Sequence, residues 1–252
     1  MPVLHRLLIV ILFKTYMDIM SNNKIVTRNH SRPIKSYVRR EGRLTKSQSN
    51  ALDNLWIKYG VDYQTGVMNF KKIFGRYAPI ILDIGVGTGD STVSHALAHP
   101  ENNYLAVEVH RPGLGQLLKK IESLSLKNIK LINHDVIDVL ETQIPNYSLS
   151  QAFIFFPDPW PKKRHHKRRL INKKIFKLMK NKLAAYGRLH IATDWKDYAD
   201  YINELNDHNS ELINLAGKNN FSPRPIWRSK TKYERRGLSL SHKIYDFCYG
   251  LP

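Results

Sequence analysis

Hydrophobic residues along the chain fall into two alternating patterns. Short, mainly apolar runs predict buried strands, listed in chain order as Ile80–Ile84, Tyr104–Val109, Ile129–Asn133, Gln151–Phe156 and Gly187–Thr193. Between them, apolar residues at helical spacing predict helices over Leu52–Tyr59, Ser91–Ala98, Leu114–Leu124, Val136–Leu140, Leu170–Leu183 and Lys196–Asn209. Strands that alternate with helices in this way predict an α/β fold with a doubly wound, mostly parallel sheet and right-handed crossovers.

The first fifty residues differ from the rest. Leu7–Phe13 is an apolar run too short to span a bilayer, which takes about 20 apolar residues. It resembles the core of a signal peptide, but we favour an upstream extension with the true start at Met17 or Met20. Residues 21–50 are polar and basic, typical of a flexible arm. We therefore expect an extension over residues 1–50 and one domain over residues 51–252.

The charged, cysteine and histidine residues of the chain indicate which kinds of molecule it can bind. Forty Lys and Arg residues against 21 Asp and Glu residues give a formal charge of +19, which favours a polyanion such as nucleic acid. The single cysteine, Cys248, cannot form an intrachain disulfide, and the scattered histidines offer no zinc-site spacing. We expect a cytoplasmic protein, monomeric or homodimeric, that binds no metal and does not associate with a membrane.

Candidate chemistry follows the ends of the predicted strands, where ligands collect in open α/β sheets. Glycines at alternate positions, Gly85, Gly87 and Gly89, let the backbone turn sharply and approach a ligand, although such a run alone is a weak signal. Asp83 precedes them. Glu108 comes 25 residues after Asp83, near the interval usual for an acid that binds ribose hydroxyls; the alternative is a solvent-facing acid.

Asp135 ends the third predicted strand and is suited either to contact an adenine amine or to cap the helix that follows. Three acids along one edge disfavour a pyrophosphate and favour a cofactor with a neutral adenosine half and a cationic sulfonium. This argument points to S-adenosyl-L-methionine. A dinucleotide-dependent dehydrogenase is a poor fit, since the third glycine that it requires would fall at Asp90.

The strongest signal follows the fourth strand, in the sequence Phe155-Phe156-Pro157-Asp158-Pro159-Trp160-Pro161. The prolines predict a rigid loop that holds Asp158 and Trp160 at the sheet edge. Either Asp158 acts on a ligand or it stabilises the turn, and either Trp160 stacks on a base or it packs the loop. The basic run that follows favours phosphate docking through Arg164, His165, His166, Lys167, Arg168 and Arg169.

This block closely resembles the signature of the tRNA (guanine-N7)-methyltransferase family. Two more stretches agree with it, Thr193-Asp194-Trp195 with Tyr198 and the run from Thr231 to Gly237, and the resemblance extends over about residues 52–247. The family usually has Glu at the position of Asp83 and often Phe at that of Val86. The resemblance implies a seven-stranded class I methyltransferase fold with a Rossmann-like sheet.

It also implies methyl transfer from S-adenosyl-L-methionine to N7 of guanosine 46 in the variable loop of tRNA. The cofactor would be bound by Asp83, Gly85, Gly87, Glu108, Asp135 and Asp158. Asp158 would also be catalytic, orienting the guanine and offsetting its developing charge. Substrate-binding positions of the family match Lys162, Asp194, Thr231, Lys232, Tyr233 and Glu234. A rival hypothesis is a non-catalytic RNA-binding protein on the same scaffold, but acids beside RNA argue against it.

Overall fold

The computed structural model describes residues 35–37, 42–207 and 211–252, all within one unit, Lys35–Pro252. The apolar run at Leu7–Phe13 and most of the basic arm lie outside the described residues. The helix α2 (Lys46–Tyr59) begins inside the expected extension, where Thr45 and Gln48 form a capping box. The division into an extension and a domain stays a prediction.

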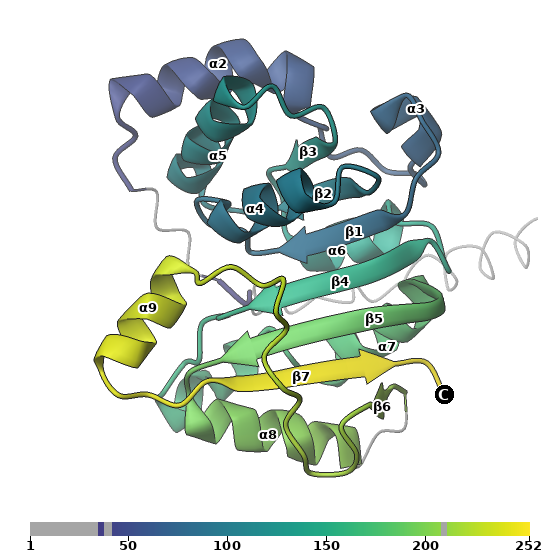
Figure 1. Cartoon of the computed structure of the whole chain (residues 1–252), viewed down its shortest axis with the longest axis vertical. Helices are drawn as coiled ribbons and strands as arrows, with labels where there is room; N and C mark the ends of the chain where they lie inside the picture. Colours follow the sequence, from purple (N-terminus) through teal and green to yellow (C-terminus); the bar gives the residue numbers. More distant parts are fainter. Residues whose placement is uncertain (1–34, 38–41, 208–210) are drawn as a thin grey trace, which may run out of the picture. The chain divides into compact units, whose positions relative to one another are not determined.

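Seven strands form a single sheet in the order β3-β2-β1-β4-β5-β7-β6 (Figure 1). Their bounds are Ile80–Ile84 (β1), Asn103–Val107 (β2), Ile129–Ile132 (β3), Leu149–Phe155 (β4), Leu183–Thr193 (β5), Ile213–Asn214 (β6) and Tyr245–Gly250 (β7). β1 to β5 pair in parallel, and β7 is antiparallel to both β5 and β6. The expected doubly wound, mostly parallel seven-stranded sheet is confirmed. Strand order reverses between β1 and β4, so ligands should bind beyond that point.

Helices cover both faces of the sheet (Figure 1). On the face of β1, β2 and β3 that carries Ile81 and Leu131, the core is completed by α2, α4 (Asp90–Ala98) and α5 (Arg111–Ser123). On the opposite face, the core is completed by α6 (Val136–Thr142), α7 (Lys173–Lys182) and α8 (Lys196–Asp207). Three further short helices are α3 (Phe70–Phe74), the 3-10 helix η1 (Lys163–Arg168) and α9 (Lys232–Ser239).

The second half of the sheet is covered differently. An irregular segment leads from β6 to α9 and crosses in front of β7 and β5 (Figure 1). Trp227 anchors it: the indole stacks on Phe153 of β4 with ring centroids 4.9 Å apart, and meets the ring of His190 of β5 at right angles, 5.1 Å away. Because Phe153 and His190 are register partners, their side chains share the face that Trp227 covers.

All five predicted strands are present, with ends that move by up to four residues. The predicted helix over Leu170–Leu183 begins later, at Lys173, because Asn172 caps it by accepting a hydrogen bond from the Ile175 amide at 3.2 Å. Two elements that the sequence pattern did not predict, α9 and β7, follow the last predicted helix. β7 pairs antiparallel with β5, and its apolar side chains are buried by residues from other segments, such as Phe176 of α7 against Tyr249 and Phe221 against Phe247.

Candidate active site

Asp83 and Glu108 lie beside each other at the carboxyl ends of β1 and β2, where the register pairs Asp83 with Ala106. Asp83 is 4% exposed and accepts a hydrogen bond from the Thr92 hydroxyl at 2.7 Å. Burial raises the pKa of Asp83 to about 7, and repulsion by Glu108 adds to the rise. A cationic ligand beside Asp83 would restore its charge.

Glu108 ties the glycine loop to the end of β2. Its carboxylate accepts hydrogen bonds from three backbone amides, those of Gly87 at 2.8 Å, Val109 at 2.7 Å and His110 at 2.9 Å. The solvent-facing alternative is wrong, since Glu108 is only 9% exposed. A carboxylate has about four acceptor positions, so one remains for a ligand hydroxyl.

Asp135 follows β3 and caps α6 by accepting from the Ile137 amide at 3.1 Å. The helix-cap alternative is therefore confirmed. Its other oxygen forms an ion pair with Lys35 at 3.0 Å, and hydrogen bonding to Asp135 raises the pKa of Lys35. An adenine amine at Asp135 would have to share this carboxylate with Lys35.

The glycine loop has the backbone geometry that its sequence requires. Gly85, Gly87 and Gly89 have φ angles of 72°, 56° and 72°, in the left-handed region that favours glycine. Side chains at Gly85 and Gly87 would enter open space, so a ligand can approach the backbone there. A glycine of α5, Gly113, packs on this loop: a Cβ at Gly113 would lie 2.5 Å from the Gly87 carbonyl oxygen.

A cavity of about 230 Å³ lies over the glycine loop. Its lining brings that loop together with Thr231, Lys232 and Tyr233, which are about 145 residues away in the chain. Further lining residues, among them Gln48, His110 and Phe155, have no site role in the sequence prediction. Gly113, which also lines the cavity, has none either, although the two glycines within the helical pattern, Gly113 and Gly115, signal close backbone approach.

The loop after β4 presents Asp158 to solvent between two residues with unusual backbone geometry. Phe156 and Trp160 have φ angles of 53° and 47°, positive values that cost energy in residues other than glycine. The Phe156 amide donates to the Ala192 carbonyl oxygen at 2.7 Å, which fixes the start of the loop on β5. Strained positions on both sides of Asp158 are typical of a functional loop.

Trp160 packs within this loop. Its indole N–H donates to the Ser36 carbonyl oxygen at 3.3 Å, and the guanidinium carbon of Arg168 lies 5.2 Å from the ring centroid. The edge of the His165 ring also meets Trp160, with centroids 5.8 Å apart. Since these contacts occupy the indole, the packing alternative fits this structure better than stacking on a base.

Arg169 is a correction to the expected phosphate contacts. Its side chain is 1% exposed, and its guanidinium pairs with Asp197. It also donates to the Pro159 carbonyl oxygen at 3.0 Å and lies over the rings of Tyr198 and Tyr201. Arg169 therefore supports the Asp158 loop from the interior of the protein and cannot reach a phosphate.

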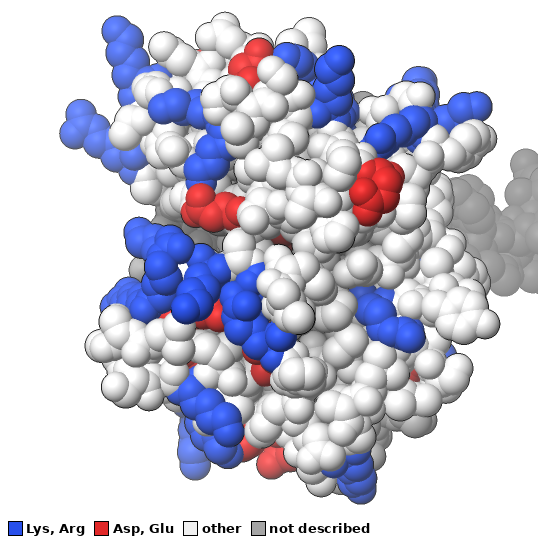
Figure 2. All heavy atoms as spheres, in the orientation of Figure 1, with Lys and Arg blue, Asp and Glu red and all other residues white. Residues whose placement is uncertain are grey.

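The rest of the basic run lies on η1 or beside it. Lys162, Lys163, Arg164 and Lys167 are exposed and available to a polyanion. His165, His166 and Arg168 are half-buried, with His166 3.8 Å from Asp197. A second basic surface covers α9, where Figure 2 shows Lys and Arg side chains gathered; its exposed members are Lys230, Lys232, Arg235 and Arg236.

Asp194 follows β5 and faces α9. The imidazole of His242 lies 3.3 Å from its carboxylate, and the Asp194 side chain is 28% exposed. A Cβ at Gly237 of α9 would lie 2.8 Å from the same carboxylate, so only glycine permits this approach. α9 thus determines where the Asp194 side chain points.

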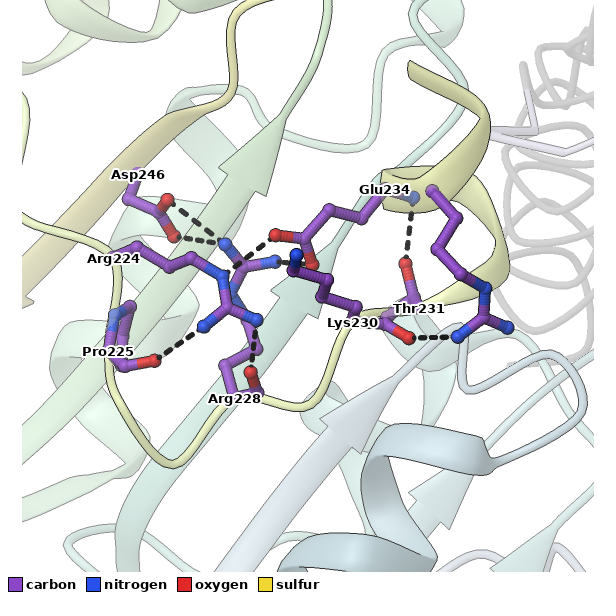
Figure 3. A network of polar contacts seen from close by, with 8 residues as sticks. Arg224, Pro225, Arg228, Lys230, Thr231, Glu234 and Asp246 are labelled. Atoms are coloured by element: carbon purple, nitrogen blue, oxygen red, sulfur yellow. Dashed lines mark hydrogen bonds and ion pairs between the residues drawn. The ribbon is translucent and has the colours of Figure 1, made fainter. Parts of the chain in front are cut away.

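Glu234 is a second correction. Instead of facing a guanine, its side chain is 1% exposed and accepts hydrogen bonds from Arg224 and Arg228, each at 2.8 Å (Figure 3). Arg228 also forms two hydrogen bonds of 3.0 Å to Asp246 of β7. The Thr231 hydroxyl caps α9 by accepting from the Glu234 amide at 3.0 Å. Glu234 therefore anchors the segment that carries Thr231.

The sequence of this chain is similar to those of known proteins. A family described as "Putative methyltransferase" matches residues 77–247. A tRNA (guanine-N(7)-)-methyltransferase of Nitrosospira multiformis is 46% identical over 225 residues, 89% of this chain and 97% of that protein. One of Alcanivorax borkumensis is 45% identical over 218 residues, 86% of this chain and 91% of that protein. The chain belongs to the tRNA (guanine-N(7)-)-methyltransferase family.

Solved structures with the same fold include an antibiotic-related methyltransferase, with a TM-score of 0.51 at 18% identity, covering 73% of this chain and 92% of that one. The 16S rRNA methyltransferase KamB also has a TM-score of 0.51, at 13% identity, covering 73% and 93%. These likenesses concern the fold alone. Family membership agrees with the position of the cavity, beyond the switch between β1 and β4.

Two other kinds of feature are absent from the part of the chain that the structure describes. No group of three or more His, Cys, Asp or Glu side chains in that part could hold a metal ion. No helix among the described residues is long and apolar enough to cross a membrane.

Proposed function

We propose that this chain transfers a methyl group from S-adenosyl-L-methionine to N7 of guanosine 46 in the variable loop of tRNA. Family membership and one observation carry the proposal: the cavity places the glycine loop and Asp83 beside Thr231, Lys232 and Tyr233. Methyl donor and base must meet in such a place. A cytoplasmic location follows from the substrate.

The residues present suit this cofactor. When bound, S-adenosyl-L-methionine supplies an electrophilic methyl group on a sulfonium. Asp83 offers a buried carboxylate to a cationic group, and Glu108 retains an acceptor position for a ribose hydroxyl. Gly85 and Gly87 leave open space before the backbone. Asp135 would accept from the adenine amine beside Lys35.

Guanine N7 carries a lone pair in the base plane, so methylation there needs no general base. The residues of the chain therefore act by holding the base and by offsetting the positive charge that grows on it. Asp158, exposed on its rigid loop, would accept from the guanine N1 and N2 donors and provide that negative charge. Asp194, Thr231 and Tyr233 would complete the base site.

Phosphate contacts would come from exposed cations on two sides of this site. Lys162, Lys163, Arg164 and Lys167 lie on or beside η1, and Lys232 begins α9. Neutralising several phosphates with Lys and Arg releases counterions, so tRNA affinity should fall steeply with salt.

The test is incubation of the protein with unmodified tRNA and labelled cofactor, followed by mapping of the modified nucleoside. We expect 7-methylguanosine at position 46. The control is the same tRNA with 7-deazaguanosine at position 46, which has carbon in place of N7 and must accept no methyl group. Absence of cofactor binding by calorimetry, with the protein folded and tRNA bound, would instead support the non-catalytic RNA-binding alternative.

A further inference from the structure

Two segments that the proposed function requires meet at one buried arginine. The Asp158 loop leaves the end of β4, and the segment with Thr231 and Tyr233 precedes and begins α9. Arg228 lies between them and is fully buried, with a side chain 0% exposed. Figure 3 shows it at the centre of a polar network that joins this segment to β7.

On one side, Arg228 holds the segment before α9. Its Nη1 donates to the Glu234 carboxylate at 2.8 Å, and its Nη2 donates to both carboxylate oxygens of Asp246 at 3.0 Å. Arg224 pairs with the other Glu234 oxygen. Two arginines thus balance two acids, as buried charges require. The contact fixes α9 on the sheet.

On the other side, Arg228 contacts the start of the Asp158 loop. Its guanidinium carbon lies 5.4 Å from the Phe155 ring centroid and 5.5 Å from that of Phe156. Cation–π contacts of this kind are attractive, and most so where water is excluded. Phe156 has the positive φ of 53° and stands two residues before Asp158. Arg228 therefore packs on Phe156, the strained residue that sets the direction of the Asp158 loop.

We propose that Arg228 is a positioning residue for methyl transfer, which holds the Asp158 loop and the Thr231–Tyr233 segment in fixed relation. The inference rests on the proposed function for its effect on turnover. The geometric coupling of the two segments stands apart from that function. The partners of the Arg228 side chain are acids and aromatic rings. Four of the five cations proposed to contact phosphates lie on or beside η1, and Lys232 alone lies in the segment that Arg228 holds, so loss of Arg228 should affect turnover more than the binding of tRNA.

The experiment compares Arg228→Lys with Lys182→Gln. Lysine at position 228 keeps the charge but cannot bridge two carboxylates in a fork. Lys182 is another buried cation, near the amino ends of β4 and β5, where it donates to the Ile144 carbonyl oxygen and to Asn146, each at 2.8 Å. It controls for a general loss of stability.

Two measurements are made on each full-length variant, hydrogen exchange and kinetics with unmodified tRNA. In Arg228→Lys we expect faster exchange in both segments, 155–162 and 229–237. We also expect kcat to fall at least about tenfold, with the KM for tRNA within about threefold, since orientation rather than binding is impaired. When Lys182→Gln loses as much thermal stability as Arg228→Lys, we expect it to show neither the faster exchange in the two segments nor the fall in kcat.

Faster exchange in residues 229–237 alone would overturn the coupling. An equal fall in kcat in both variants at matched stability would reduce Arg228 to a structural role. If the wild-type protein does not methylate tRNA, the proposed function fails, while the exchange data still decide the coupling. Should Arg228→Lys not fold, the charge-balanced pair Arg228→Gln with Asp246→Asn, which leaves Arg224 paired with Glu234, replaces it.

Discussion

The two halves of the sheet build their parts of the site by different means. In the half formed by β1, β2 and β3, most hydrogen bonds to the acids come from residues close in sequence: Thr92 donates to Asp83, Val109 and His110 donate to Glu108, and Ile137 donates to Asp135. In the half formed by β4, β5 and β7, the site residues lie on irregular loops. Those loops are held by ion pairs of two buried arginines: Arg169 pairs with Asp197 of α8, and Arg228 pairs with Asp246 of β7.

The difference follows from the demands on each half. A small cofactor needs a preformed pocket, which a glycine loop at a strand end supplies. A guanosine within folded tRNA needs a surface that loops can present, and loops have few backbone hydrogen bonds of their own. Long-range ion pairs supply the rigidity that the second half lacks, at the cost of burying charge.

The largest expected effect tests the second half. Asp158→Ala should lower the rate of methyl transfer at least about 100-fold, because charge offset on the reacting base is removed, while tRNA affinity stays within about threefold. Single-turnover assays and filter binding measure the two quantities. Asp200→Ala, which removes an exposed acid of α8 paired with Lys196, is the control and should leave both unchanged. Equal turnover in Asp158→Ala would reject the catalytic role.

The basic run should separate into two classes. Replacing Lys163, Arg164 and Lys167 with Gln should weaken tRNA binding by about 30-fold at low salt. The slope of log affinity against log salt concentration should also become shallower, by about one for each phosphate that is no longer neutralised. Arg169→Gln should instead lower the melting temperature without changing the salt slope, because that guanidinium is buried. A shallower slope in Arg169→Gln would restore it to the phosphate-binding residues.

Asp83→Asn tests the first half through pH. Between pH 4 and 7 an unfolded Asp83 ionises while the folded one, with a pKa of about 7, retains its proton. Wild-type stability therefore falls across that range and levels off above it. At pH 8 we expect the free energy of unfolding of the variant to exceed that of the wild-type protein by roughly 4 kcal/mol. We expect the variant to bind cofactor about tenfold more weakly.

Denaturant titrations and calorimetry check these two results. Asp200→Asn, an exposed acid, should show neither of them. A stability difference that stays constant from pH 5 to 8 would contradict the raised pKa of Asp83.

The smallest expected effect concerns two histidines that contact Trp227, one from each half of the sheet: His95 of α4 and His190 of β5. Burial lowers the pKa of each histidine to about 4. As pH falls from 6.5 to 4 the unfolded chain gains protons that the folded chain does not, so stability decreases. The free energy of unfolding of His190→Gln should therefore fall by about 1 kcal/mol less than that of the wild-type protein when the pH is lowered to 5.5. Identical pH profiles by chemical denaturation would refute this.

By itself, the sequence determined the five parallel strands, the glycine loop and the acids at the strand ends. These features depend on periodicity and on turns of a few residues, which are local. The rigid loop around Asp158 was also predictable, because proline restricts its own backbone and that of its neighbour.

Only the tertiary structure decided which charged residues face the ligand. Arg168 and Arg169 are adjacent and chemically identical, yet one is half-buried against Trp160 and the other is closed in by Asp197 and Tyr198. Glu234 pairs with Arg228, which also pairs with Asp246 on β7, 18 residues further along the chain. The burial of a charge depends on a partner that folding brings to it, and no local pattern contains that partner.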